Sequence, residues 1–133
     1  MTEFTETSVE ELNAILHDAT FDLDSLALDA GVLSLRGKLY ARTPEVDYGI
    51  FGFRLTVREV GRYELGDQAQ IGQLMFEELT MDADQILRIE GSGPVVLRLS
   101  VRKGLRLSIA VDERPLKVRK WLWLRQCAVE GEE

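Results

Sequence analysis

The chain has 133 residues, of which 45% are apolar and 29% are charged, and its formal net charge at pH 7 is −7. This length is typical of one folded domain, and the composition is that of a globular protein and not of a disordered or fibrous one. We therefore predict a single β-rich domain over residues 1–133, with fraying at residues 1–6 and 129–133.

The cysteine count and the hydropathy pattern bear on the cellular compartment. Cys127 is the only cysteine, so no disulfide can form within the chain, and this fits a reducing compartment. The first residues are acidic, whereas a signal peptide begins with basic residues followed by an apolar run. No stretch approaches the roughly 18 consecutive apolar residues of a membrane span. We expect a cytoplasmic protein that does not enter a membrane.

The charges are distributed unevenly along the chain. Residues 1–30 contain eight Asp or Glu and no Lys or Arg, while residues 98–125 contain nine Lys or Arg and two acidic residues. The acidic start and the basic end could neutralise each other across the fold. Alternatively, they could form separate faces of opposite potential, one of them a binding face. The sequence leaves both alternatives open.

A short helix is predicted near the N-terminus. Ser8 and Glu11 have the spacing of a capping box, in which each side chain accepts a hydrogen bond from a free backbone N–H of the first turn. The helix should end at residues 17–19, where His17 meets the negative end of the helix dipole and Asp18 closes the next turn. The apolar residues at helical spacing are Val9, Leu12, Ile15 and Leu16.

After the helix, apolar residues recur at every second position, which is typical of strands. Residues 21–28 and 33–41 follow this pattern on either side of a turn, and together they predict a β-hairpin. The step from Leu23 to Leu26 is three residues, so we predict a β-bulge near Ser25.

Further strands are predicted toward the C-terminus. The clearest alternation covers residues 51–57, whereas residues 60–73 contain three glycines and predict a loop with at most a short strand at 62–65. Two short strands follow at residues 74–81 and 85–90. A second hairpin is then predicted over residues 95–111, with its turn at Lys103-Gly104.

These elements predict a mainly β fold. We expect an antiparallel sandwich or a strongly curved sheet of about seven to eight strands, with one short N-terminal helix.

Catalytic and metal-binding motifs are missing from the sequence. One histidine and one cysteine are too few for a zinc site, which usually needs about four such ligands. The Asp-x-Asp pairs at residues 22–24 and 82–84 lack the further oxygen ligands of a calcium loop. The glycines at residues 91–93 precede a predicted strand and not the helix that a phosphate cradle requires. We therefore expect no enzymatic activity, no cofactor and no metal site.

Residues 15–42 begin with Ile15-Leu16-His17-Asp18-Ala19 and continue into the first predicted hairpin. This opening resembles that of several small bacterial domain families, which have a short helix, an L-H-D-A-like corner and then a β-hairpin. Some of these families have no known function, and some are associated with immunity proteins that neutralise polymorphic toxins. The resemblance implies a β-rich fold with a leading helix and a stoichiometric protein-binding role, and it carries over no site residues.

The stretch KVRKWLWLRQ, residues 117–126, contains both tryptophans. As a strand it would place cations and indole rings on one face and leucines on the other, and arginine–tryptophan stacking is favourable. We predict a closing strand whose Trp/Arg face is one candidate partner-binding surface, and acidic residues near the N-terminus form the other. The candidate partner-binding residues are Trp121, Trp123, Arg119, Arg125, Glu10, Glu11, Asp22 and Asp24.

These features favour a non-catalytic protein-binding domain of bacterial type, immunity-like or an adaptor, whose partner is another protein or a second copy of the chain. An acidic surface would suit a basic partner such as a nuclease toxin. One alternative is a nucleic-acid-binding β domain that uses the basic Trp/Arg C-terminal strand. A second alternative is a small-ligand-binding barrel. The cations considered for nucleic-acid binding are Arg98, Arg102, Arg106, Lys117, Arg119 and Lys120.

Overall fold

The computed structural model describes residues 2–43, 46–67, 72–92, 95–112, 116–122 and 126–131. Within them the chain forms one helix and antiparallel strands, so the predicted mainly β fold with a short N-terminal helix is confirmed. The elements in chain order are β1 (Thr2–Thr7), α1 (Val9–Ile15), β2 (Thr20–Asp29), β3 (Val32–Thr43), β4 (Val46–Asp67), β5 (Gln73–Met81), β6 (Ile86–Gly91), β7 (Val95–Val111), β8 (Lys117–Leu122) and β9 (Gln126–Gly131).

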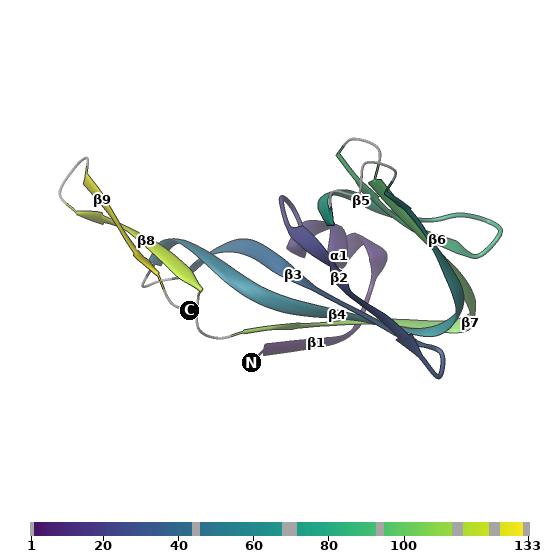
Figure 1. Ribbon diagram of the computed structural model, residues 1–133. Helices are drawn as coiled ribbons and strands as arrows, with labels where there is room; N and C mark the ends of the chain where they lie inside the picture. Colours follow the sequence, from purple (N-terminus) through teal and green to yellow (C-terminus); the bar gives the residue numbers. More distant parts are fainter. Residues whose placement is uncertain are drawn as a thin grey trace.

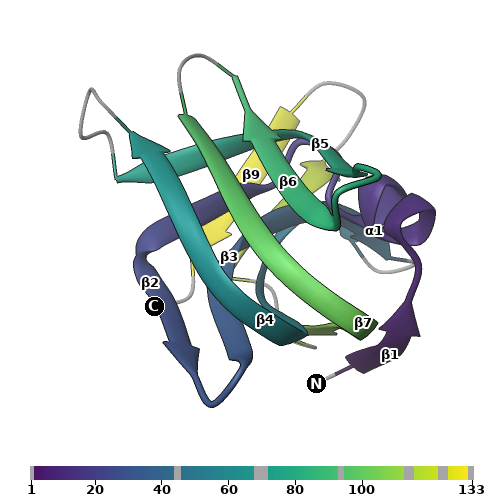
Figure 2. The same ribbon diagram turned by 90° about the vertical axis from the view of Figure 1, so that its right-hand side faces the viewer.

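The strands form one sheet that curves back on itself. Their order is β1-β7-β6-β5-β2-β3-β4-β8-β9, and an additional pairing joins β4 to β7. This pairing closes β7, β6, β5, β2, β3 and β4 into a ring, as Figures 1 and 2 show. β1 lies at the edge of β7, and the β8–β9 hairpin projects away from the ring (Figure 1). The strongly curved sheet is thus one of the two forms that the sequence predicts.

The two longest strands, β4 and β7, pair with each other over two stretches, and each stretch belongs to one half of the ring. β4 has 22 residues and β7 has 17. The first half of β4, at residues 53–58, pairs with residues 106–111 of β7, and the second half, at residues 60–67, pairs with residues 95–101. β3 pairs with the first half of β4, while β6 pairs with the first half of β7. Each long strand therefore passes from one half of the ring into the other.

Two predicted connections are parts of these long strands, so the predicted turn and most of the predicted loop are wrong, whereas the short strand expected at 62–65 lies within β4. The predicted hairpin turn at Lys103-Gly104 lies inside β7, and most of the predicted loop at 60–73 belongs to β4. In β7 the apolar residues keep odd numbers on both sides of Gly104, so their alternation fits one continuous strand as well as a hairpin. Residues 61–65 are exposed, which explains why they lack a buried apolar pattern.

Aliphatic and aromatic side chains fill the ring. Phe21 contacts Phe53 and Phe76 edge to face, with ring centroids 5.2 Å and 6.0 Å apart. The largest fully buried side chains come from both halves of the ring and from the helix, and they are Phe21, Leu12, Leu16, Leu33, Leu35, Leu55, Leu74, Leu79, Leu87, Ile89, Leu97 and Leu99.

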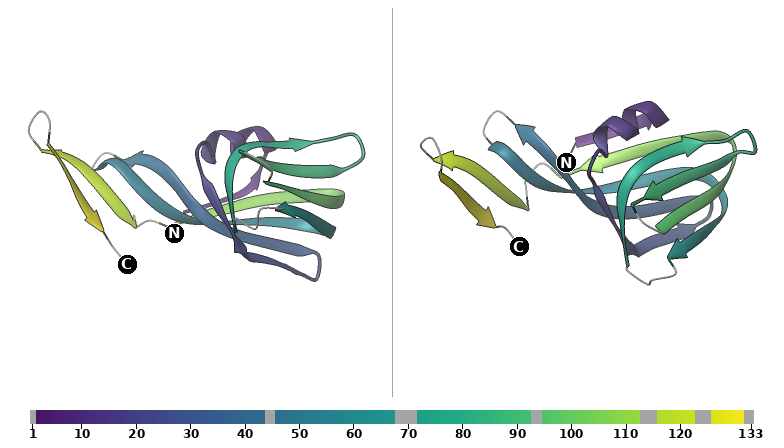
Figure 3. Two further views of the ribbon diagram at one scale, coloured as in Figure 1. Left: turned by 45° about the horizontal axis from the view of Figure 1, so that its top comes forward. Right: turned by 90° about the horizontal axis from the view of Figure 1, so that it is seen from above.

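Helix α1 packs against this core beside β5 (Figures 2 and 3). Its predicted capping box is present: the Glu11 N–H donates to Ser8 Oγ, and the Ser8 N–H donates to Glu11 Oε1, both at 3.1 Å. Asp18 has a φ of 63° and turns the chain into β2, as expected for this corner.

The side chain of Asn13 joins the helix to β5. Its Nδ2 donates to the Leu79 carbonyl at 2.9 Å, and its Oδ1 accepts from the Leu79 N–H at 2.8 Å. One primary amide thus makes the pair of hydrogen bonds that a neighbouring strand would make.

The predicted hairpin and bulge in residues 20–43 are confirmed. Asp29 pairs with Val32 across a two-residue turn in which Ala30 and Gly31 both have positive φ, as a type I′ turn requires. The register of β2 against β3 shifts between Asp22 and Ala27. Within this shift the Ser25 hydroxyl donates to the Asp22 carbonyl at 2.6 Å and accepts from the Arg36 N–H at 2.8 Å, so it satisfies the backbone at the bulge.

The two ends of the chain are paired with other strands. Thr2–Thr7 form β1, which pairs with the C-terminal half of β7, and β9 extends to Gly131 and pairs with β8. Lys117–Leu122 of the predicted closing strand form β8, whereas residues 123–125 lie outside the described part of the chain. Paired end strands can still open in solution, so fraying of residues 1–6 and 129–133 stays a prediction.

We expect Gly37→Ala to destabilise the ring strongly. A Cβ at Gly37 would collide with the Thr20 carbonyl oxygen and would lie 2.8 Å from the Phe53 ring, so β2 or the core must shift. Overpacking of this kind costs about 1–3 kcal/mol or more in the free energy of unfolding, which urea denaturation measures. Gly61→Ala is the control, because the nearest heavy atom to its added Cβ is 3.6 Å away. Equal losses in both variants would contradict the steric account.

We also expect Asn13→Ala to destabilise the protein by about 1–3 kcal/mol, because both backbone groups of Leu79 lose their partner. The measurement is again urea denaturation, combined with hydrogen exchange of the Leu79 amide. Glu10→Ala, at an exposed helix position, should change stability by less than about 0.5 kcal/mol. An unchanged exchange rate at Leu79 in the Asn13 variant would show that the amide pair contributes little.

Candidate functional site

The outer surface of β3, β4 and β7 carries a group of exposed cations. Strand residues alternate between the two faces of a sheet, and the odd-numbered residues of β3 and of the first half of β4 point into the core. The even-numbered residues therefore face outward. We call the five exposed cations on this surface the basic face: Arg36 and Lys38 on β3, Arg54 and Arg58 on β4, and Arg106 on β7.

The strand register sets these cations against one another. Arg36 pairs with Arg54 across β3 and β4, and Arg58 pairs with Arg106 across β4 and β7. Residues directly opposite in an antiparallel pair have Cβ atoms about 4.5–5.5 Å apart, and like charges at this spacing are destabilising. The basic face is therefore a surface on which positive charges oppose one another across neighbouring strands.

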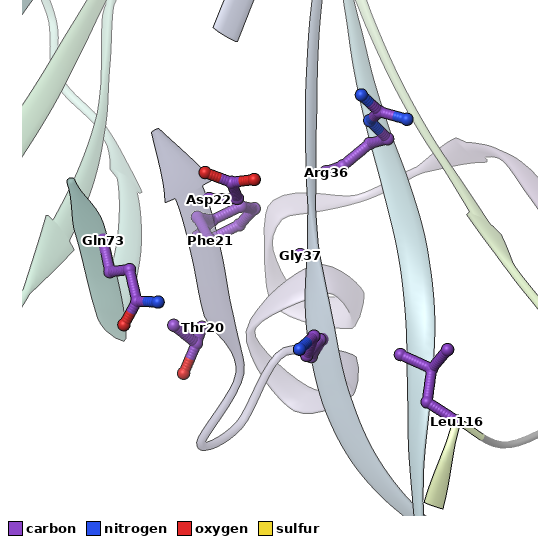
Figure 4. A pocket seen from close by; sticks show the side chains of 8 residues that line it. Thr20, Phe21, Asp22, Arg36, Gly37, Gln73 and Leu116 are labelled. Carbon is purple, nitrogen blue, oxygen red and sulfur yellow. The ribbon is translucent and has the colours of Figure 1, made fainter. Parts of the chain in front are cut away.

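Acidic residues lie near the basic face without forming ion pairs with it. Asp22 of β2 is the register partner of Arg36, and an Asp112 carboxylate oxygen lies above Gly52. Figure 4 shows the Arg36 side chain extending away from Asp22. Among the side chains that the structure describes, none of the five cations is within ion-pair distance of a carboxylate. The ion pairs there lie elsewhere, at His17–Asp18, Arg88–Asp82 and Arg98–Glu64.

The acidic start of the chain meets its basic region where β1 pairs with residues 107–111 of β7. Among the side chains that the structure describes, no ion pair joins an acidic residue of positions 1–30 to a basic residue of positions 98–125. Arg98, from the basic region, pairs with Glu64 of β4 at 3.5 Å. The ion pairs among the described side chains therefore lie elsewhere, although the backbones of the two ends are neighbours in the sheet.

The sequence-based candidates occupy three separate places. Glu10 and Glu11 lie at the start of α1, and Glu11 is engaged in the capping box. Asp22 and Asp24 lie on exposed positions of β2, where the Asp24 N–H donates to Asp22 Oδ1 at 3.1 Å. Among the described side chains, no hydrogen bond or ion pair connects these two acidic pairs.

The remaining candidates belong to the C-terminal hairpin. Arg119 and Trp121 are residues of β8, whose register against β4 pairs Lys117 with Ile50 and Arg119 with Tyr48. Trp123 and Arg125 lie outside the described residues. β8 thus continues along β4 beyond the end of β7, in line with the strands that carry the basic face.

The sequence-based reasoning missed Arg36, Lys38, Arg54 and Arg58. In the sequence these cations alternate with apolar residues, and this pattern already places them on the outward face of two predicted strands. Recognising a face required knowing that β3, β4 and β7 are neighbours and which residues are opposite.

The surface around Arg36 is indented but open. A depression of about 300 Å³ lies between β5, β2 and β3, and its lining includes Thr20, Asp22, Arg36 and Gln73 (Figure 4). A second depression, of about 360 Å³, lies between Arg36, Arg54 and Asp112. Both are on the outer side of the sheet, whereas the interior of the ring is occupied by the buried side chains described above.

The aspartate pairs have local structural roles. Asp82 Oδ1 accepts from the Asp84 N–H at 2.9 Å and from the Ile86 N–H at 3.1 Å, and so it shapes the turn between β5 and β6. In the part of the chain that the structure describes, no group of three or more His, Cys, Asp or Glu residues is arranged to hold a metal ion.

No family model, curated protein or solved structure matches the chain. The resemblance of residues 15–42 to families associated with toxin immunity therefore stays a prediction. Among the described residues, no helix has the length and apolar character needed to cross a membrane.

The opposed cations generate a prediction about stability. We expect Arg54→Gln to raise the free energy of unfolding by about 0.2–1 kcal/mol at low ionic strength, because it relieves the repulsion with Arg36. The gain should shrink near 1 M salt, where the Debye length is about 3 Å.

Urea denaturation at both salt concentrations measures the effect. Arg62→Gln removes the same charge from an exposed position of β4 that is paired with Ser100, and so it is the matched control. The same salt-dependent gain in both variants would assign the effect to net charge and not to the opposed pair.

Proposed function

We propose that the chain is a non-catalytic protein-binding domain that uses its basic face to bind an acidic surface of another protein. The observation that supports this proposal is the gathering of five exposed cations on one sheet surface, with no ion-pair partner among the described side chains. An acidic partner would neutralise charges that repel one another in the free chain, and complementary potentials also speed association.

The sequence alone favoured an acidic surface on this chain and a basic partner, whereas the proposed interface is basic and its partner acidic. The acidic residues Glu10, Glu11, Asp22 and Asp24 favoured a basic partner such as a nuclease. Glu11 is used by the helix cap, and Asp22 accepts a hydrogen bond from the backbone beside it. Their carboxylates are therefore partly committed to the fold, whereas the side chains of the basic face have no such partners within the described ranges.

A protein partner fits the charge of the chain better than nucleic acid does. The net charge of −7 opposes any anionic partner, but this cost is largest for a duplex, which carries a charge about every 1.7 Å along its whole length, whereas an acidic protein patch can be confined to the contact. A single-strand binder would also need several aromatic rings on which successive bases stack. The exposed aromatic residue beside Lys38 on β3 is Tyr40, which offers a single ring. Nucleic-acid binding remains the second candidate, because β8 brings Lys117 and Arg119 into line with β4.

The finer parts of the proposal rest on the sequence. The opening at residues 15–42 supports an immunity-like or adaptor role of bacterial type, and the single cysteine supports a cytoplasmic location. The proteins encoded beside this chain in its genome are accordingly the first partners to test.

The test compares wild-type protein with Arg36→Glu/Arg54→Glu in biolayer interferometry against each purified neighbour-encoded protein. We expect one of them to bind the wild type, and the double variant to lose at least about tenfold in affinity, as for charge pairs at an interface. Arg62→Glu/Arg98→Glu makes the same change of charge on the other half of the sheet and should keep the affinity.

Two results would count against the proposal. One is equal binding by both double variants, which would place the interface elsewhere. The other is the absence of any protein partner together with salt-dependent binding of an oligonucleotide, which would favour the nucleic-acid alternative.

A further inference from the structure

A second cluster of cations lies where β4 and β7 bend together. Arg58, Arg102 and Arg106 are all exposed, and they line a depression of about 480 Å³. We call these three residues the arginine corner. The remaining wall includes the Ala30–Gly31 turn and Glu59.

The bend results from an interrupted register. Arg58 pairs with Arg106, but Val60, two positions further along β4, pairs with Val101. β7 therefore contains extra residues at the bend, and Glu59 opposite them has a φ of 66°. The bend is held from the side by the β2–β3 turn, since the Val60 N–H donates to the Gly31 carbonyl at 2.9 Å.

This geometry brings the three guanidinium groups to one depression. Arg58 and Arg106 face outward from opposed positions, and Arg102, which directly follows Val101 in β7, lines the same depression. None of the three is in an ion pair with a described carboxylate. Glu59 is the one acidic residue among the lining residues, so the lining retains a net charge of +2.

We propose that the arginine corner binds the phosphate group of a small molecule. The net charge matches a dianion, and guanidinium groups bind phosphate oxygens through paired N–H donors in a fixed planar geometry. The depression of about 480 Å³ has room for an organic group beside the phosphate.

This inference goes beyond the proposed function. The arginine corner shares Arg58 and Arg106 with the basic face, whereas Arg36 and Arg54, which test the protein interface, lie outside it. Loss of protein binding and loss of phosphate binding can therefore be observed independently.

The test is calorimetric titration of the whole chain with inorganic pyrophosphate, inorganic phosphate and a single-stranded oligonucleotide at one fixed ionic strength. We expect saturable binding of pyrophosphate with one equivalent per chain, and weaker binding of inorganic phosphate. Arg102→Gln/Arg106→Gln should reduce the pyrophosphate affinity at least tenfold, while Arg62→Gln/Arg98→Gln, with the same loss of charge elsewhere on the sheet, should leave it unchanged.

A measurement on the wild type guards against misfolding of the variants. Pyrophosphate should shift the backbone amide resonances of Gly31, Glu59 and Gly61, and it should leave those of α1 unchanged. The proposal is overturned if pyrophosphate binds no better than chloride at equal ionic strength, or if both double variants lose affinity equally. It is also overturned if the oligonucleotide binds more tightly than pyrophosphate, since the ligand would then be nucleic acid.

Discussion

The pairing of β4 with β7 is the constraint on which the rest of the structure depends. Both strands run through both halves of the ring, and their pairing is the additional contact that turns a linear order of strands into a closed one. It sets Arg58 opposite Arg106, while the neighbouring β3–β4 ladder sets Arg36 opposite Arg54. The arginine corner is a consequence of the β4–β7 ladder, and the basic face depends on this ladder together with the β3–β4 ladder.

Local features of the fold were predictable because short-range chemistry determines them. The capping box at Ser8 and Glu11, the bulge at Ser25 and the β2–β3 turn each depend on residues within a few positions. The long strands were not predictable in the same way. Gly104 is a residue typical of turns, but the alternation around it is uninterrupted, and only pairing with β4 determines that the chain continues.

The candidate site was also only partly predictable, because it depends on contacts between strands that are distant in the sequence. The cations of β3 and β4 were visible in the sequence as outward positions of alternating strands. Their opposition depends on a register between strands, and in β7 on an irregularity at Glu59 that no local pattern indicates. Arg102 and Arg106 were recognised only as part of a basic region, since their partner Arg58 is more than forty positions away in the chain.

The amide of Asn13 has a consequence for association between molecules. It occupies the backbone donor and acceptor of Leu79 on the side of β5 away from β6, where a strand of another chain could otherwise pair. The helix thus protects a sheet edge as well as covering the core. A chain whose first helix unfolds would expose that edge together with the apolar surface under Leu12 and Leu16, which are the two elements that intermolecular β-aggregation requires.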